Sequence, residues 1–293
     1  MKKKARRALV AATRVTKGKH FHLGERATED TGGLDEADAV ALLAEGVERL
    51  ADLQRDLYAS QCWALLAVFQ AMDAGGKDGT IRHVLSGVNP QGVRVMSFKQ
   101  PGPVELAHDF LWRIHAALPE RGQIGVFNRS HYEEVLVARL HPEVLAAQRL
   151  PEARRHDLWK HRYADIRNFE SYIARQGILP LKFFLHISKA EQCRRLLARL
   201  DDEDKLWKFS ASDLKERARW AAYQEAYERA IIETASPEAP WFVVPADHKW
   251  FARLVVVEAM IEALEDLSLQ PPEPEDRAAL EAARMLLRAE ADG

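Results

Sequence analysis

The chain has 293 residues, enough for a large buried core, and its 47% hydrophobic and 29% charged content is ordinary for a globular protein. The formal net charge of -2 excludes a generally basic surface, so any binding of a polyanion must be local. No apolar run reaches the about 18 residues that a membrane span needs, and the segment after Met1–Arg7 is too short for a signal peptide. We therefore expect a cytoplasmic protein with no membrane partner.

Residues 1–33 begin with a basic run and lack sustained periodicity, which predicts an N-terminal arm over the domain. A solvated tail is favoured over contact with a polyanion. From Asp35 to Tyr58, apolar residues recur at steps of three and four, which predicts one amphipathic helix. The narrow stripe is typical of packing on the domain, and a homo-oligomer, either a dimer or a tetramer, is left open.

Five short apolar runs follow, each flanked by helical segments: Trp63–Gln70, Gly92–Phe98, Gln123–Asn128, Leu181–Ile187 and Trp241–Pro245. Alternating strands and helices predict an α/β domain over residues 34–270, with a mostly parallel five-stranded sheet covered by helices on both faces. Ligands of such sheets bind outside the carboxyl ends of the strands. Polar residues that follow the first, third and fourth runs should therefore meet at one edge.

A glycine loop follows the first run and leads into a predicted helix; it consists of Ala74, Gly75, Gly76, Lys77, Asp78, Gly79 and Thr80. Glycines let backbone N–H groups approach phosphate oxygens, while the helix N-terminus and the lysine supply positive charge. Compared with the Walker A pattern G-x-x-x-x-G-K-[ST], Ala71 replaces the first glycine and Asp78 replaces the hydroxyl residue. The alternative is a tight strand-to-helix turn with an incidental lysine.

Longer motifs follow the loop, at Val84–Gly92, Ser97–Pro101, Phe127–Arg139, Lys182–Lys189 and Lys205–Ser210. In this order and spacing they closely resemble the second polyphosphate kinase family, and most of all its subclass acting on nucleoside mono- and diphosphates. The resemblance runs from about residue 35 to residue 266. It implies a P-loop kinase-like fold and a helical lid that closes over the phosphates.

Transfer of a phosphoryl group gathers charge on oxygens that cations must offset, so we expect Mg²⁺ as a cofactor. Asp73 before the glycines and Asp78 after the lysine are candidate ligands. The resemblance favours Asp73, which matches the acidic residue within the family's loop. For Asp78, a carboxylate that merely complements the helix dipole is an equal alternative.

Asn128 and Arg129 end the third predicted strand, where much of the family has Asp-Arg. A neutral Asn128 is a poorer ligand for magnesium, so the missing charge is expected from Glu133 or Glu134 in the segment that follows. Arg129 can clamp a phosphate through two parallel hydrogen bonds. A salt bridge to Glu133, four residues on, is the alternative and does not exclude that role.

A basic helix is predicted after the fourth strand, because Ser188 and Glu191 form a capping box that starts a helix at Lys189. The segment of about residues 189–212 is interpreted as a lid whose cations bind polyphosphate or nucleotide phosphates. A solvated basic face is the alternative. The predicted phosphate-binding cations are Lys189, Arg194, Arg195, Arg199, Lys205 and Lys208.

Other residues receive structural interpretations. The histidines are scattered without a metal-binding pattern. The aromatic residues Trp207, Trp220, Tyr223 and Tyr227 are expected to pack the lid rather than to form a stacking platform for a nucleic acid, and stacking of a base on one of them is the alternative. We therefore expect no nucleic-acid partner. Residues 271–293 are acidic and rich in alanine, which predicts a peripheral C-terminal helix without assigned chemistry.

Together these features predict a kinase that moves the terminal phosphoryl group of inorganic polyphosphate to AMP or ADP with Mg²⁺, making ATP from ADP. The predicted catalytic residues are Asp73, Lys77, Asn128, Arg129 and Glu133. An ATP-dependent nucleoside monophosphate kinase and a non-catalytic polyanion-binding scaffold are the alternatives. The presence of Asp73, Lys77 and Arg129 together argues against the scaffold.

Overall fold

A single sheet forms the centre of the computed structural model, which describes residues 3–273 and 276–292. Within these residues six strands pair in the order β1-β6-β5-β2-β4-β3, and every pair except β1–β6 is parallel. The mostly parallel α/β sheet is confirmed. The strands are β1 (Arg14–Val15), β2 (Ala64–Ala71), β3 (Val93–Ser97), β4 (Ile124–Asn128), β5 (Ile178–His186) and β6 (Trp241–Pro245).

The predicted number of five strands is corrected to six, because β1 comes from the segment predicted as an arm. Strand β1 pairs antiparallel with β6, and it has only two residues, which is too short to show a pattern in the sequence. It follows the helix α1 (Lys3–Thr13), whose Val10 is fully buried. Arg6 and Arg14 form ion pairs of 3.0 and 2.7 Å with Glu258 and Glu262. These basic side chains therefore bind carboxylates of the protein itself.

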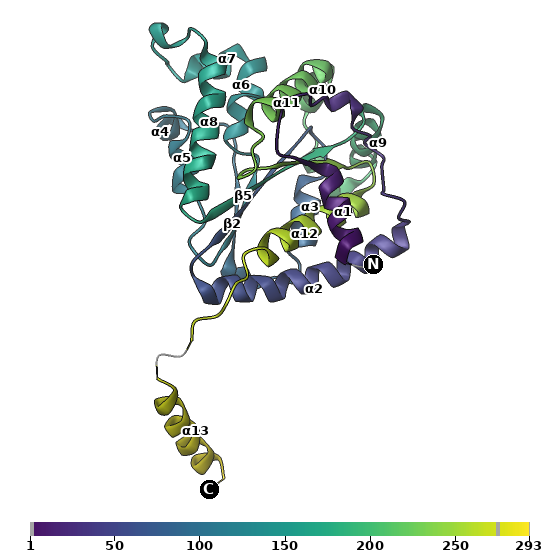
Figure 1. Ribbon diagram of the computed structural model, residues 1–293. Coiled ribbons are helices and arrows are strands. Elements are labelled where there is room, and N and C mark those ends of the chain that lie inside the picture. The colour runs from purple at the N-terminus through teal and green to yellow at the C-terminus, as the bar shows by residue number, and fades with distance from the viewer. Residues whose placement is uncertain (1–2, 274–275, 293) are drawn as a thin grey trace.

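Helices cover both faces of the sheet (Figure 1). On one face α12 packs against α1, α2 and α3, while α8 and α11 lie on the other. The helices are α2 (Glu36–Ser60), α3 (Lys77–Val84), α4 (Pro103–Leu106), α5 (Trp112–Ala116), α6 (Val137–Leu140), α7 (Pro142–Ala147), α8 (Leu158–Arg175), α9 (Lys189–Leu200), α10 (Ala211–Ala218), α11 (Trp220–Thr234), α12 (Lys249–Glu265) and α13 (Arg277–Ala291). Short 3-10 helices are η1 (Leu23–Glu25), η2 (Pro90–Gly92), η3 (His131–Glu134), η4 (Glu152–Arg154) and η5 (Glu203–Lys208).

The central strands are mostly apolar because both faces of the sheet are covered. All eight residues of β2 and all five of β6 are buried. Across neighbouring strands Phe69, Phe183 and Phe242 stack, with ring centroids 5.1 and 5.2 Å apart. Strand β2 lies between β4 and β5, so the loops that follow these three strands emerge together at one edge of the sheet.

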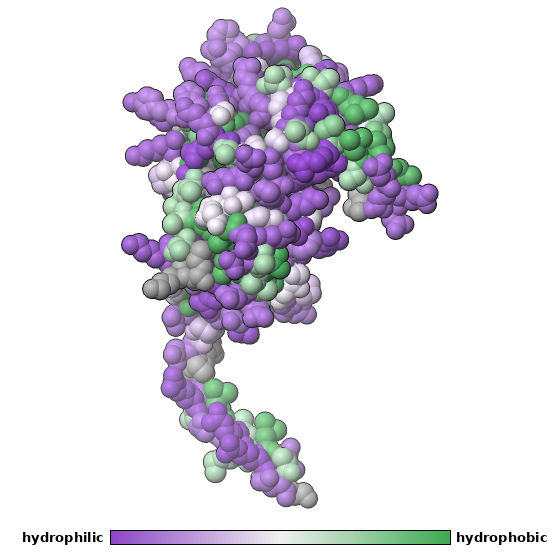
Figure 2. Space-filling view, turned by 90° about the vertical axis from the view of Figure 1, so that its right-hand side faces the viewer, coloured by the Kyte–Doolittle hydropathy of each residue, from purple (hydrophilic) through white to green (hydrophobic). Residues whose placement is uncertain are grey.

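The C-terminal helix α13 stands apart from the domain (Figure 1), and none of its residues is buried. Its apolar side chains Leu280, Met285, Leu286 and Leu287 are exposed, and apolar surface lies along it in Figure 2. The helix predicted in this region is therefore present. Among the described residues, no helix is long and apolar enough to cross a lipid bilayer.

Candidate active site

The glycine loop connects β2 to α3 and turns through left-handed backbone conformations at Ala74 (φ 59°) and Gly76 (φ 97°). Glycine is required at position 75, because a Cβ atom there would lie 2.5 Å from the Cβ of Ala71 and 2.8 Å from the carbonyl oxygen of Met72. Ala71 is still the last residue of β2. The first glycine of the Walker pattern is thus replaced at a position with extended backbone, which alanine adopts freely.

Lys77 is the first residue of α3, as predicted, and its Nζ donates to the carbonyl oxygen of Ala71 at 3.0 Å. Burial, with the nearby Arg129 guanidinium, lowers the pKa of Lys77 to about 8. The carboxylates of Asp73, Glu133 and Asp78 act in the opposite direction. Burial therefore destabilises the charged form of Lys77, and the negative charge of a bound phosphate would stabilise it.

Arg129 follows the end of β4 with a left-handed backbone (φ 63°), and its N–H donates to the carbonyl oxygen of Phe69 at 3.1 Å. Its guanidinium contacts two carboxylates, Asp73 at 3.0 Å and Glu133 at 3.1 Å. The predicted i, i+4 salt bridge is confirmed, and the side chain also reaches the glycine loop. These contacts raise the pKa of Arg129, so the group stays cationic.

Two amide side chains hold the surrounding carboxylates. Asn128 Nδ2 donates to Asp78 Oδ1 at 2.6 Å, linking the end of β4 to the first turn of α3. The buried Gln70, with its amide oriented so that both ends are satisfied, donates to Glu133 Oε1 at 3.0 Å and accepts from Ser130 Oγ at 3.1 Å. Glu133 is thus fixed from two sides, by Gln70 and by Arg129.

The predicted lid segment, about residues 189–212, forms α9, η5 and the start of α10, and Ser188 caps α9 by accepting from the N–H of Glu191 at 3.0 Å. Arg195 links α9 to the glycine loop and to the segment after β6, because its guanidinium donates to the carbonyl oxygens of Ala74 at 3.2 Å and of Asp247 at 3.2 Å. Arg199 pairs with Asp213 at 3.3 Å. Arg195 is therefore a structural link as well as a cation of the site.

One cleft of about 960 Å³ collects most of these residues, but Gln70 and Glu133, the latter predicted as a catalytic residue and metal ligand, are not among those that line it. Of the described residues, nine Lys and Arg side chains line it against four carboxylates, so it is strongly cationic although the whole chain is not. The predicted residues at its wall are Asp73, Ala74, Gly75, Gly76, Lys77, Asp78, Gly79, Thr80, Asn128, Arg129, Arg194, Arg195 and Arg199. Such local concentration of positive charge suits a polyanion.

Some predicted site residues lie elsewhere. Glu134, expected as a metal ligand, is buried away from the cleft, because its carboxylate pairs with Arg162 at 3.3 Å and with Gln148 at 2.5 Å. Lys189 is exposed on α9 and does not line the cleft. The backbone of Lys205 and Lys208 belongs to η5, and their side chains lie outside the described part of the structure.

Sequence reasoning missed six charged residues of the cleft: Glu191, which it assigned only to the capping of α9, and Arg82, Lys99, Asp213, Lys249 and Arg253. They come from α3, the segment after β3, α9, α10 and α12, so only the folded chain brings them together. Of these residues, Lys99 is the one that lies inside a motif recognised in the sequence, Ser97–Pro101. Burial, with Asp73 nearby, raises the pKa of Asp213, which marks this carboxylate as part of the same electrostatic cluster.

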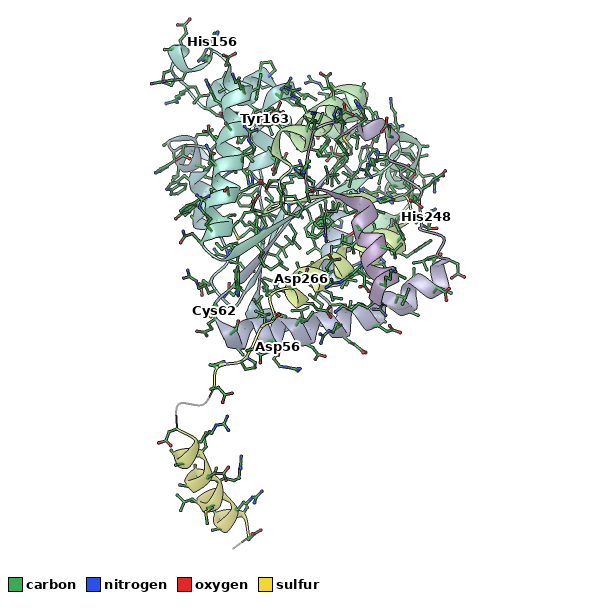
Figure 3. The ribbon with its side chains drawn as sticks, in the orientation of Figure 1. Asp56, Cys62, His156, Tyr163, His248 and Asp266 are labelled. Atoms are coloured by element: carbon green, nitrogen blue, oxygen red, sulfur yellow. The ribbon has the colours of Figure 1, made fainter. Side chains whose placement is uncertain are left out.

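The histidines are as scattered as predicted; His156 lies at the outer tip of the molecule beyond α8 (Figure 3). Within the described residues, no three His, Cys, Asp or Glu side chains group in a way that would hold a metal ion by themselves.

Comparison with known proteins matches residues 33–272 to the family described as polyphosphate kinase 2. An ADP-polyphosphate phosphotransferase of Rhodopseudomonas palustris is 54% identical over 234 residues, which cover 79% of this chain and 81% of that protein. An AMP/ADP-polyphosphate phosphotransferase of Meiothermus ruber is 48% identical over 264 residues, covering 89% and 95%. The crystal structure of polyphosphate kinase 2 from Arthrobacter aurescens TC1 aligns with a TM-score of 0.86 and 42% identity, covering 95% of this chain and 96% of that one. The chain belongs to the polyphosphate kinase 2 family.

Proposed function

We propose that this protein transfers the terminal phosphoryl group of inorganic polyphosphate to AMP and to ADP. The names of the two relatives support both the donor and the acceptors. The structural observation that carries the proposal is the cleft itself, in which nine cationic side chains surround the glycine loop and spread over α3, α9 and α12. That length of positive surface suits a chain of phosphates better than a single phosphate group.

Lys77 and Arg129 stabilise the transferred group from two sides. Their cationic groups offset charge on the phosphoryl oxygens, and both are held in place before substrate arrives, Lys77 by the carbonyl of Ala71 and Arg129 by Asp73 and Glu133. The attacking oxygen of the acceptor phosphate is already ionised. The reaction therefore needs no protein nucleophile and no strong general base, so positioning and charge account for the catalysis.

The carboxylates of Asp73 and Asp78 fit the requirements of Mg²⁺. The ion binds proteins through one or two carboxylates together with substrate phosphates, and both side chains line the cleft beside Lys77. When bound, Mg²⁺ would neutralise charge on the phosphate oxygens. Glu133, which contacts Arg129 and Gln70, would support this set indirectly by holding the guanidinium that touches Asp73.

The lid segment would bind the donor on the α9 side of the cleft. Arg194, Arg195 and Arg199 of α9 line the cleft together with Arg82 of α3 and Arg253 of α12, so an extended polyphosphate would be contacted from three helices. Ordering of α9 and α10 over the phosphates would exclude water and favour transfer to a nucleotide over hydrolysis.

The test is to mix the protein with MgCl₂ and AMP and to supply either polyphosphate or ATP as the donor. We expect ADP and then ATP to form with polyphosphate at a much higher rate than ADP forms with ATP. Rapid ADP formation with ATP and none with polyphosphate would instead identify an ATP-dependent nucleoside monophosphate kinase. Binding of polyphosphate without any transfer to AMP or ADP would identify a scaffold.

A further inference from the structure

Two residues of α9 hold the backbone at the start of the glycine loop. The side chain of Gln192 donates from Nε2 to the carbonyl oxygen of Asp73 at 2.9 Å. One turn further along α9, Arg195 donates to the carbonyl oxygen of the next loop residue, Ala74, at 3.2 Å. Ala74 has a left-handed backbone with a φ of 59°, which a residue other than glycine keeps only where its surroundings hold it. The shape of the loop therefore depends in part on α9.

The amide of Gln192 is buried and has a partner at each end. Only 1% of the residue is exposed, and its Oε1 accepts from Arg217 Nη1 at 2.9 Å. These partners fix the orientation of the amide, because a carbonyl oxygen needs a donor and a guanidinium needs an acceptor. Loss of either partner would leave a buried polar group unsatisfied, which costs free energy. Gln192 therefore couples the position of Arg217 to that of the Asp73 carbonyl.

Arg217 lies near the end of α10, beyond the segment that the sequence predicted as the lid. Its Nη1 also donates to the carbonyl oxygen of Lys189, the first residue of α9, at 2.8 Å. Four residues earlier on α10, Asp213 pairs with Arg199 of α9 at 3.3 Å. Residues four apart lie on the same face of a helix, so one face of α10 contacts α9 at two places.

The two contacts between α10 and α9 differ in their exposure to substrate. Asp213 and Arg199 both line the cleft, so bound phosphates would compete with the Asp213 carboxylate for the guanidinium. Arg217 and Gln192 are not among the residues that line the cleft, and their contact is not subject to this competition. It is therefore the contact that can keep α10 linked to the glycine loop while phosphates occupy the cleft.

Asp73 connects this hydrogen-bonded chain to the proposed chemistry. Its carboxylate contacts Arg129 at 3.0 Å and lines the cleft beside Lys77. A change at the Asp73 carbonyl would rotate the peptide group that joins Asp73 to Ala74, and the carboxylate would move with it. Small displacements of positioning groups lower the rate of a reaction that depends on preorganised charge.

We propose that Gln192 and Arg217 are positioning residues for phosphoryl transfer, which hold Asp73 in place when α10 is docked on α9. The assignment rests on the proposed function, because it takes Asp73 as part of the transfer site. Neither residue contacts substrate in this assignment. Both therefore act on the rate of transfer and not on the affinity for polyphosphate.

The first test separates the two ends of the Gln192 amide. Gln192→Glu keeps an acceptor for Arg217 but removes the N–H group that bonds to Asp73, whereas Arg217→Met removes the contact with α10. Lys215→Met is the matched control, because it removes a cation from an exposed position on the same helix. We expect kcat to fall about tenfold in both test variants, with KM for polyphosphate within about twofold of the wild type, and no change in the control.

The second test needs no transfer. Hydrogen exchange of the loop peptide that contains residues 73–76 is measured in the free protein, and we expect faster exchange in both test variants than in the wild type and the control. The midpoint of thermal unfolding is measured for every variant, and the less buried Arg217 provides the test if Gln192→Glu does not fold.

The proposal is overturned if Gln192→Glu transfers phosphate with the kcat of the wild type, since docking of α10 alone would then suffice. It is also overturned if KM rises with unchanged kcat, or if loop exchange in both test variants equals that of the wild type. If the wild type itself transferred nothing from polyphosphate, the proposed function would fail. The exchange measurement would still decide whether Gln192 and Arg217 hold the loop.

Discussion

Asn128 at the end of β4 donates a hydrogen bond of 2.6 Å to Asp78 in the first turn of α3. The contact places a neutral amide beside a carboxylate of the cationic cleft. It also gives Asn128 a defined role, since it joins the strand that carries Arg129 to the helix that carries Lys77.

We expect Asn128→Asp to tighten the binding of Mg²⁺. A second carboxylate would replace the amide beside Asp78, and the repulsion between the two is relieved by a divalent cation. The ratio of AMP to ADP turnover should also shift, because the two acceptors place different phosphate charge near the metal. The measurement is turnover of each acceptor against the concentration of MgCl₂, with Asn128→Ala as the uncharged control. If neither the Mg²⁺ requirement nor the ratio of AMP to ADP turnover changed, the role of Asn128 would be restricted to its hydrogen bond with Asp78.

Substitution of Lys77 tests whether the glycine loop takes part in phosphoryl transfer. Lys77→Ala should lower the rate of transfer from polyphosphate about 10²-fold or more, because one preorganised charge of the site is lost. The variant should stay folded, since within the described residues the side chain of Lys77 makes a single hydrogen bond, to the carbonyl oxygen of Ala71. Steady-state rates and circular dichroism are measured together. A rate within a few-fold of the wild type would show that the loop does not carry the chemistry.

The lowered pKa of Lys77 predicts a pH dependence. The ammonium form is the active form, and with a pKa of about 8 it loses its proton as the pH rises through that value. We therefore expect kcat/KM for polyphosphate, which reports on the free enzyme, to fall above about pH 8. Lys77→Arg keeps its charge in this range, so whatever its absolute rate, the alkaline fall should be absent. The same fall in both proteins would assign the titration to another group.

The lid arginines should separate into two kinds. Arg199→Ala should weaken polyphosphate binding and flatten its dependence on salt, because one charge is removed from the cleft. Arg195→Ala should do the same and also lower the unfolding temperature, because it ties α9 to Ala74 and Asp247. Arg167→Ala on α8 is the control outside the cleft. If Arg199→Ala bound polyphosphate as tightly as the wild type at low and high salt, the basic face of α9 would be solvated surface without a role in binding.

The fully buried Lys182 lies on β5 and supports the segment that follows Arg129. Its Nζ contacts Glu170 at 2.6 Å and Tyr132 at 3.1 Å, and Tyr132 belongs to the turn after Arg129. Lys182→Met leaves Glu170 buried without its cation, so we expect a loss of about 3–5 kcal/mol in the free energy of unfolding. Urea denaturation measures it. Arg55→Met, at an exposed pair with Asp52, should change nothing measurable, and equal stabilities of the two variants would contradict the prediction.

The sequence by itself determined the local features. An apolar run of the length of β2 followed by Gly75, Gly76 and Lys77 can be recognised because strand propensity, turn geometry and helix start all depend on neighbouring residues. The same holds for the five strands, for the helix that begins after Asp35, and for the capping of α9 by Ser188. Arg129 was found through its motif and its place at a strand end.

Only the tertiary structure decided which charges share the cleft. Arg253 comes from the first turns of α12 and Asp213 from α10, and no spacing in the chain relates them to Lys77. The orientation of Glu134 depended on Arg162, 28 residues away, whose burial requires a carboxylate partner. Strand β1 likewise forms because the backbone of β6 provides hydrogen-bonding partners for an antiparallel pair. Such pairings depend on surfaces that form only when distant segments pack together.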